Sequence, residues 1–241
     1  MRGRLTVMAV LLFLAGGGAI AATGDGAGEA ANKKAIKYAD AELFIETNAT
    51  DKDIGLQLFA DAEAWDSFKV FDPKGRMLMQ RASTEGRLHG WGLTEFFWET
   101  EEPEFSDVPV KQFKKRFPAG TYTFRGETVD GRTLVGSDRL SHLIPRGPVV
   151  TSPTKGQVLD RENVVVSWEP VTKPAGVDIA SYEVIIEQRE RSLDMRLPPD
   201  VTSVSIPPEF LTPGVKALGE VLAKEKSGNQ TITHIPRFTA E

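Results

Sequence analysis

Hydrophobic and polar residues alternate most regularly between Tyr182 and Gln188. Tyr182, Val184 and Ile186 fall on one face of an extended chain, and the opposite face is mostly acidic. A period of two with a polar outer face indicates a half-buried antiparallel strand. The pattern therefore predicts a strand that turns one face to a core and the other to solvent.

A second apolar run, Val164–Val166, comes earlier in the chain and consists of β-branched residues. Trp168 lies an even number of residues from Val164 and Val166, so these three side chains share a face. Pro170 ends the run, because proline cannot donate a hydrogen bond to a neighbouring strand. The loop that follows is too short for a helix. The sequence thus predicts that the two strands are neighbours in the fold.

The front half shows shorter runs of the same kind, bounded by turn residues. Asp72–Gly75 predicts a turn in which Pro73 sets the first φ angle. Asp130–Gly131, between two alternating runs, is a strong hairpin signal. The predicted strands of the front half are residues 41–46, 55–59, 68–71, 76–80, 93–98, 121–126 and 133–136.

One segment of the front half has the spacing of a helix. Val110, Phe113 and Phe117 fall at positions i, i+3 and i+7, which places them in one apolar stripe. Pro109 precedes the segment, where proline is tolerated, and Pro118 stops it. The sequence therefore predicts one short helix over residues 110–117.

Several features of the back half follow one another in order: Pro153, Trp168, Tyr182, Ser203–Ile206, Leu211–Gly214 and Glu220–Ala223. With these features, residues 147 to 240 resemble the fibronectin type III family. The resemblance implies a seven-stranded sandwich and no particular activity, because this fold hosts adhesion, spacing and binding roles alike. In that family a tyrosine usually follows the Pro-Gly turn and ties down the corner. The matching place here is near Ala217, so that bond is absent.

The segment Pro118–Gly136 resembles the closing hairpin of immunoglobulin-like bacterial modules. The front half as a whole resembles bacterial exported proteins that pair such a module with a fibronectin-like domain. Together these resemblances imply an all-β fold of two antiparallel β-sandwich domains, immunoglobulin-like with one short helix at residues 41–145 and fibronectin type III-like at residues 146–241. The boundary at Ile144–Pro148 is predicted to be a short, stiff joint.

The first 21 residues have a different character. Two arginines precede the apolar run Leu5–Leu14, and Ala19 and Ala21 are small residues at the positions that specify cleavage. This is the pattern of a secretory signal peptide cleaved after Ala21. The alternative is an uncleaved membrane anchor, but the apolar run is short and glycines break it at residues 16–18. We therefore predict a periplasmic or secreted protein.

Composition adds three expectations. Residues 22–40 are small and polar, so we predict a flexible leader there. The chain has no cysteine, so packed cores must hold an exported form together, which fits a bacterial envelope or secreted protein. Without the two signal-peptide arginines, 27 basic residues face 34 acidic ones, a formal charge of −7. We therefore expect no nucleic-acid partner, and no stable membrane span after signal cleavage.

Candidate catalytic residues are few. His89, His142 and His234 lie far apart and lack the spacing of metal ligands. Ser141 precedes His142, but a nucleophile and its base need converging side chains, and the chain has no G-x-S-x-G elbow. The sequence thus predicts a non-enzymatic protein with no catalytic residues.

The loop at residues 46–53 holds the best metal candidates. Hard cations such as Ca²⁺ take several oxygen ligands from an adaptable backbone, and Asp51 and Asp53 followed by Gly55 resemble part of an EF-hand loop. The acid that would complete such a loop is missing, because Ala62 stands in its place. The alternative is an ordinary turn in which Asn and Asp side chains bind their own backbone. No other cofactor is predicted.

Residues 91–99 concentrate aromatic side chains. On a strand, Phe96 and Trp98 share one face, and Phe97 lies between two glutamates on the other. Because rings occur on both faces, we expect part of the segment to be exposed. Trp91, Phe97 and Trp98 are therefore a candidate patch for a protein partner or a glycan, with core packing as the alternative.

These observations predict an exported, non-enzymatic protein that binds or spaces other components of the bacterial envelope through protein–protein interaction. An envelope protein is the predicted partner, contacted through the aromatic front domain or a sheet edge. The alternative is a carbohydrate-binding module, with structural Ca²⁺ near Asp51 and Asp53. A hydrolase with carboxylate chemistry is a third hypothesis, which an open cleft with two facing acids of raised pKa would favour.

Overall fold

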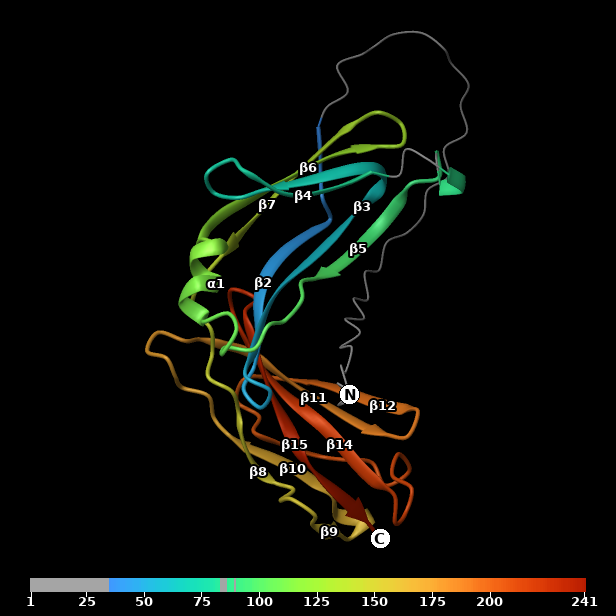
Figure 1. Cartoon of the computed structure of the whole chain (residues 1–241). Helices are drawn as coiled ribbons and strands as arrows, with labels where there is room; N and C mark the ends of the chain where they lie inside the picture. Colours follow the sequence, from blue (N-terminus) through green and yellow to red (C-terminus); the bar gives the residue numbers. More distant parts are fainter. Residues whose placement is uncertain (1–34, 83–85, 89) are drawn as a thin grey trace. The chain divides into compact units, whose positions relative to one another are not determined.

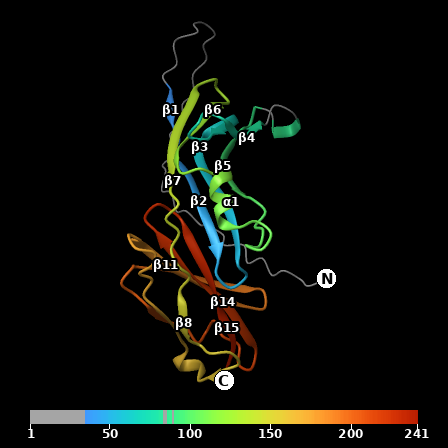
Figure 2. The same ribbon diagram turned by 60° about the vertical axis from the view of Figure 1, so that its left-hand side comes forward.

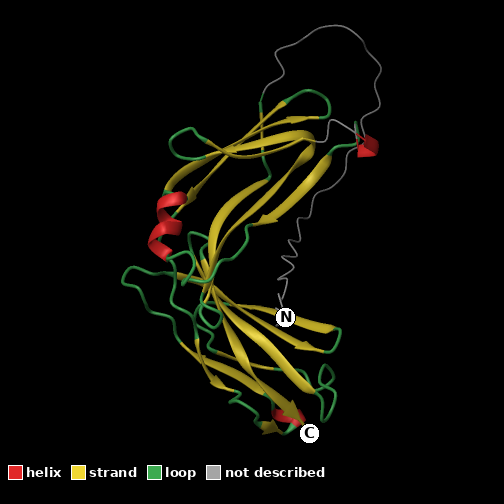
Figure 3. Cartoon of the chain, viewed as in Figure 1, coloured by secondary structure: helices red, strands yellow, loops and turns green. Residues whose placement is uncertain are grey.

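The computed structural model describes residues 35–82, 86–88 and 90–241, which belong to one compact unit. The predicted signal peptide, residues 22–34 of the predicted leader and His89 lie outside the described residues. Strands dominate the described chain, beside one α-helix and two short 3₁₀ turns at Gly86–Leu88 and Arg161–Asn163 (Figure 3). The predicted all-β fold class is confirmed.

The front part contains the helix α1 (Val110–Arg116) and the first seven strands (Figure 1). The helix follows Pro109 directly, as predicted, and its Phe113 ring is buried. The strands are β1 (Ile36–Lys37), β2 (Asp40–Asn48), β3 (Asp53–Phe71), β4 (Met77–Ala82), β5 (Leu93–Glu99), β6 (Gly120–Thr128) and β7 (Thr133–Leu140).

The 19-residue strand β3 organises the front part. Its first half pairs with β2 and β5, and its second half pairs with β6 and β4. The pairing registers shift between Asp61 and Trp65 and between Trp65 and Ser67, and such bulges bend a strand at the corner between two sheets. The predicted strands 55–59 and 68–71 are therefore one strand. Sequence patterns missed the link because its Ala, Asp and Glu residues favour strands little.

The start of the described chain is held against the front core. β1 pairs in parallel with β7 (Figure 2), and the neighbouring Tyr38 is only 8% exposed. Its ring lies 6.1 Å from that of Phe124, in an edge-on contact. The leader predicted for residues 22–40 thus does not extend to residues 36–40, which lie in or between strands.

The back part is a sandwich of a three-stranded sheet, β13-β10-β8, and a second sheet that runs β15-β14-β11-β12. These seven strands are the arrangement that the fibronectin type III resemblance implies. The strands are β8 (Val149–Ser152), β10 (Val165–Glu169), β11 (Ile179–Gln188), β12 (Arg191–Leu197), β13 (Ser203–Ser205), β14 (Lys216–Glu225) and β15 (Gln230–Ala240), with a short β9 (Val158–Leu159) beside β15.

The predicted apolar faces meet in the core of this sandwich. Val166, Trp168 and Tyr182 are buried there, and the rings of Trp168 and Tyr182 lie 5.3 Å apart. The Tyr182 hydroxyl accepts a hydrogen bond from the Val171 backbone N–H at 2.8 Å. Strands β10 and β11, which correspond to the two predicted apolar runs, are therefore neighbours across the sandwich.

Fibronectin type III domains commonly use a tyrosine to hold the corner after the Pro-Gly turn. In this chain a buried glutamine makes the hydrogen bonds at that corner. Gln188 is fully buried, and Ala217 stands in the tyrosine position. The Gln188 amide donates to the carbonyls of Thr212 and Val215, at 3.2 and 2.9 Å. Its oxygen accepts from the Thr212 N–H at 2.7 Å and from Arg191 at 3.0 Å. The Gln188 side chain thus provides hydrogen-bond partners for several polar groups of the corner.

Gln188→Leu should lower the free energy of unfolding by about 2 kcal/mol, because it leaves buried corner groups without partners. Urea unfolding followed by tryptophan fluorescence measures the change. Gln80→Leu, at an exposed position of β4, is the matched control and should shift stability by less than about 0.5 kcal/mol. Equal effects of the two substitutions would show that Gln188 does not hold the corner.

The front and back sheets are continuous through one short parallel pairing. Residues Glu46, Thr47 and Asn48 of β2 pair with Gln230, Thr231 and Ile232 of β15. The hydroxyls of Thr47 and Thr231 share a hydrogen bond at 2.8 Å, and Thr231 also donates to the Pro145 carbonyl at 2.6 Å. Backbone and side-chain hydrogen bonds therefore connect the two parts on either side of the predicted joint.

Asn229 is the best-connected side chain of this joint, and it is fully buried. Its oxygen accepts from the Ile45 N–H of β2 at 2.8 Å. Its amide lies within hydrogen-bonding distance of the Ser141 carbonyl and hydroxyl, both at 3.1 Å, and of the Leu143 carbonyl at 3.0 Å. Further along the joint, a Cβ atom at Gly147 would lie 2.4 Å from the Ala49 side chain. The joint is thus closely packed and polar.

Candidate functional site

Strand β5 forms a border of the front sheet (Figure 1). Among the described strands it pairs with β3 alone. Phe96 and Trp98 pack against the front core, and Phe97 projects from the other face, opposite Phe59 of β3. The alternation predicted from the sequence is therefore present.

Trp91 lies just before β5 and is 81% exposed. Its backbone N–H and that of Gly92 both donate to the Leu88 carbonyl, at 3.0 and 3.4 Å, so a tight turn carries the ring. Leu88 itself is 51% exposed. Two large apolar side chains thus face solvent at the start of the strand.

The three residues of the predicted aromatic patch occupy different environments. Trp91 is exposed, Phe97 is partly buried on the outer face, and Trp98 faces the core. Trp98 packs against the front core, as the alternative hypothesis of core packing expects. Trp91 is the ring of this set that is best placed to contact another molecule.

An acidic cluster lies on the outer face of the same sheet. Carboxylate oxygens of Glu46, Glu99 and Glu102 lie within 4.8 Å of one another. Glu46 comes from β2, Glu99 ends β5 and Glu102 follows it. Gly55 of β3 leaves the space that Glu102 fills, because a Cβ there would lie 2.8 Å from the Glu102 side chain. No sequence pattern predicts this cluster, since β3 brings Glu46 beside two acids that come much later in the chain.

Burial changes the acidity of this cluster. It raises the pKa of Glu46 to about 7, with smaller contributions from the charges of Glu99 and Glu220. Burial also raises the pKa of Glu102 to about 8, helped by the charges of Glu46, Glu99 and Asp53. The pKa of Glu99 is raised by burial as well. Near neutral pH the cluster therefore holds protons.

Raised pKa values of facing acids are what the hydrolase hypothesis requires, but the surroundings of Glu46 do not suit catalysis. Glu46 is 6% exposed. One of its oxygens accepts from the Gln57 amide at 2.7 Å and the other accepts from Gln230. A catalytic acid needs an oxygen within reach of its substrate, and both oxygens of Glu46 are held by buried amides.

Of the predicted metal candidates, Asp51 lies in the β2–β3 turn and Asp53 is the first residue of β3. The Asn48 oxygen accepts from the backbone N–H groups of Thr50 and Asp51, at 2.9 and 3.1 Å, which is the ordinary turn of the alternative hypothesis. Asp51 is exposed and lies 3.5 Å from Nε2 of His234. Within the described residues, neither Asp51 nor Asp53 belongs to the cluster whose spacing suits a metal ion. Calcium binding at this turn stays a prediction.

His234 connects this turn to the back sheet. Its Nε2 lies 3.2 Å from the buried carboxylate of Glu220 on β14 and 3.2 Å from the Asn48 amide. The hydrogen bond with Glu220 raises the pKa of His234, and the charges of Asp51 and Asp53 act in the same direction. The contacts of His234 therefore suit an ion-paired structural residue.

The other sequence candidates for catalysis do not converge. The Ser141 hydroxyl contacts that of Ser227 at 3.0 Å. Nε2 of His142 contacts the Phe117 carbonyl at 2.8 Å, so it is a donor. Both residues therefore have structural partners, and they do not form with each other the nucleophile–base pair that catalysis requires.

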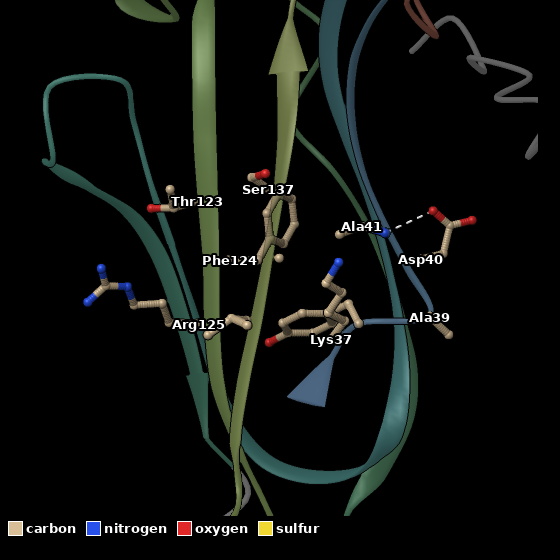
Figure 4. Close-up of a pocket in the computed structure, with 11 residues that line it drawn as sticks. Lys37, Ala39, Asp40, Ala41, Thr123, Phe124, Arg125 and Ser137 are labelled. Carbon is tan, nitrogen blue, oxygen red and sulfur yellow. Dashed lines mark hydrogen bonds between the residues drawn. The ribbon is translucent and has the colours of Figure 1, made fainter. Parts of the chain in front are cut away.

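A pocket of about 640 Å³ lies between the β1–β2 link and the β6–β7 hairpin (Figure 4). Asp40 turns its carboxylate away from the pocket, toward the Ala41 N–H at 2.8 Å. The side chains of Thr123 and Arg125 extend away from Lys37 (Figure 4). The polar groups that line the pocket therefore do not converge on one point, so the pocket suits no particular class of ligand.

The fold and this surface define an all-β protein with a seven-stranded back sandwich and an aromatic, acidic sheet border in front. No family model matches the chain, and no curated protein matches it either. No helix among the described residues is long and apolar enough to cross a membrane.

Solved structures that resemble the chain are fibronectin type III and adhesion-protein structures. The chicken CNTN1 FN1–FN3 domains are 12% identical, with a TM-score of 0.35 over 86% of this chain and 68% of that one. A two-domain fibronectin type III segment of chicken tenascin is 15% identical, with a TM-score of 0.28 over 83% and 98%. A tetra-tandem repeat from the extending region of a large adhesion protein is 12% identical, with a TM-score of 0.30 over 84% and 50%.

Proposed function

We propose that the protein is an exported, non-enzymatic protein that binds or spaces other components of the bacterial envelope by protein–protein interaction. The observation that carries the proposal is Trp91, a tryptophan 81% exposed beside an edge strand. Large aromatic side chains are enriched among the residues that dominate binding energy in protein interfaces. Export is supported by the basic and apolar N-terminal sequence.

The joint supports the spacing part of the proposal. Two separate hydrophobic cores are connected by the β2–β15 pairing and by the buried hydrogen bonds of Asn229. A connection of this kind restricts the relative movement of two modules, which a flexible linker does not. A protein that holds partners at a set spacing needs such a connection.

Trp91→Ala should abolish capture of the partner while leaving stability unchanged within about 0.5 kcal/mol, because the ring is exposed. The chain from Ala22 is immobilised and exposed to an envelope fraction, and the retained proteins are compared between variants. Val158→Ala is the matched control, since Val158 is 58% exposed on the back part. Equal recovery of the partner by both variants would remove Trp91 from the site.

Carbohydrate binding is the second candidate, and the same exposed ring favours it. An exposed tryptophan offers an apolar face with a polar edge on which a sugar ring can stack. Retention of cell-wall or capsular glycans by the immobilised chain, lost in Trp91→Ala and without a recovered protein, would replace the first proposal by the second.

A further inference from the structure

We propose that the free edge of β5 binds an extended, lysine- or arginine-rich segment of the partner protein, which adds to the front sheet as a further strand. The proposal rests on the proposed protein-binding function and specifies the chemistry of its partner. Three features of the described residues carry it: an unprotected edge, an uncompensated negative charge, and aromatic rings next to that charge.

Within the part of the chain that the structure describes, the edge of β5 lacks the usual protection. An edge strand presents unpaired N–H and C=O groups, and proteins commonly block such edges with lysine, proline or bulges. β5 contains no lysine, arginine or proline. The edge strand β12, of the same length, carries Arg191 and Arg196. β5 is therefore a suitable template for strand addition.

The charge around β5 is negative and unpaired. Residues 88–110 contain no lysine or arginine. Among the described residues, no ion pair joins the acids of this segment to a basic side chain. Outside the Glu46–Glu99–Glu102 cluster, which holds protons near neutral pH, these acids are Glu95, Glu101, Glu104 and Asp107. A basic segment would supply the charges that the described residues do not.

The pairing register places like charges directly opposite one another. Asp40 of β2 faces Asp61 of β3, and Asp61 faces Glu95 of β5. Such cross-strand pairs destabilise a sheet. The charge of Asp61 also contributes to the raised pKa of Asp40, after burial. A lysine or arginine laid beside Glu95 would convert this repulsion into attraction.

Aromatic rings accompany these acids. Phe97 projects from the same face as Glu95 and Glu99, and Trp91 lies exposed before the strand. Cations bind favourably over aromatic faces, and the long stems of lysine and arginine cover apolar surface. The surface therefore fits a segment in which basic and apolar residues alternate.

The acidity of the cluster predicts how pH affects this binding. Burial, together with the charges of Glu46, Glu99 and Asp53, raises the pKa of Glu102 to about 8. A basic segment binds the ionised cluster more tightly than the protonated one. Binding should therefore strengthen as the pH rises from 6 to 9, and it should release protons.

The test measures binding of a fluorescent KVKVKVK peptide to the chain from Ala22 by anisotropy. An EVEVEVE peptide controls for charge, and KVKVKVK with alternate backbone nitrogens methylated controls for strand pairing. We expect binding of the unmodified basic peptide alone, at least about ten-fold tighter than that of either control. Hydrogen exchange should slow at β5 in the complex. Equal binding of the methylated peptide, or slowed exchange elsewhere, would overturn strand addition.

Variants on the protein locate the site. Glu95→Lys should weaken the basic peptide about ten-fold, and Glu209→Lys, at an exposed position of the back part, should not. Equal weakening by both variants would mean that peptide binding depends only on the net charge of the protein. That result would contradict binding at β5.

The proposed function is judged separately. An envelope protein that is captured through Trp91 but is displaced by no basic peptide would leave protein binding intact and remove this inference. Peptide binding at β5 without any captured protein would instead count against the proposed function.

Discussion

Asn229→Leu should lower the free energy of unfolding by about 3 to 5 kcal/mol, more than any other single polar substitution in the joint. The substitution leaves the Ile45 N–H and the Ser141 and Leu143 carbonyls without their partner. Each buried group that loses its partner costs about 1 to 3 kcal/mol. Urea unfolding, followed by fluorescence and by far-UV circular dichroism, measures the change.

The same variant should change the form of the unfolding curve. Because Asn229 lies between the two cores, the wild-type protein should unfold in one transition and Asn229→Leu in two, one for each core. Asn163→Leu is the matched control, since Asn163 is exposed and its amide contacts only Asp160. A single transition in Asn229→Leu with the control's stability would show that the joint does not depend on this residue.

The back sandwich could be predicted from the sequence because its signals are local. The alternation at Tyr182, Val184 and Ile186 sets one face of β11, and all three side chains lie in the back core. The Pro-Gly turn and Trp168 lie where the fibronectin type III resemblance places them. The missing tyrosine was also foreseen, but its replacement by Gln188 was not, because nothing near Gln188 in sequence marks it as a partner of Thr212.

The front part was less predictable. A 19-residue strand with two register shifts does not repeat one pattern along its length, so β3 divides into two apparent strands in the sequence. The contact between β1 and β7 joins residues about a hundred positions apart, beyond any periodic signal. The immunoglobulin-like character of the front part and the boundary at residue 145 stay predictions.

The candidate site, too, could be predicted only in part from the sequence. Alternation correctly placed Phe97 on the face opposite Phe96 and Trp98. It could not distinguish the exposed Trp91 from the core-facing Trp98, because both are tryptophans within a short aromatic run. The Glu46–Glu99–Glu102 cluster depends on β2 and β5 flanking β3. Each acid alone resembles an ordinary solvent-facing residue, so only the pairing of the strands reveals the cluster.

The acidity of that cluster makes stability depend on pH in a specific direction. The pKa of the Glu46 carboxyl is about 7 in the folded protein, raised by burial from an ordinary value of 4.5. The folded state therefore binds this proton more tightly than the unfolded state does, so stability falls as the pH rises from 4.5 to 7 and stays lower above that range. Glu102, whose pKa is raised to about 8, acts in the same direction.

Glu46→Gln should therefore stabilise the protein at pH 8 by about 2 to 3 kcal/mol, since a neutral amide replaces a carboxylate that is costly to ionise. At pH 4.5 the gain should disappear, because the wild-type carboxyl is then protonated. Urea unfolding at the two pH values measures the difference. Glu101→Gln, at an exposed position, is the control and should change stability little at either pH. A gain that is the same at both pH values would mean that ionisation of Glu46 is not its cause. A loss at pH 8 would mean that Glu46 is stabilising as an ion, held by Gln57 and Gln230.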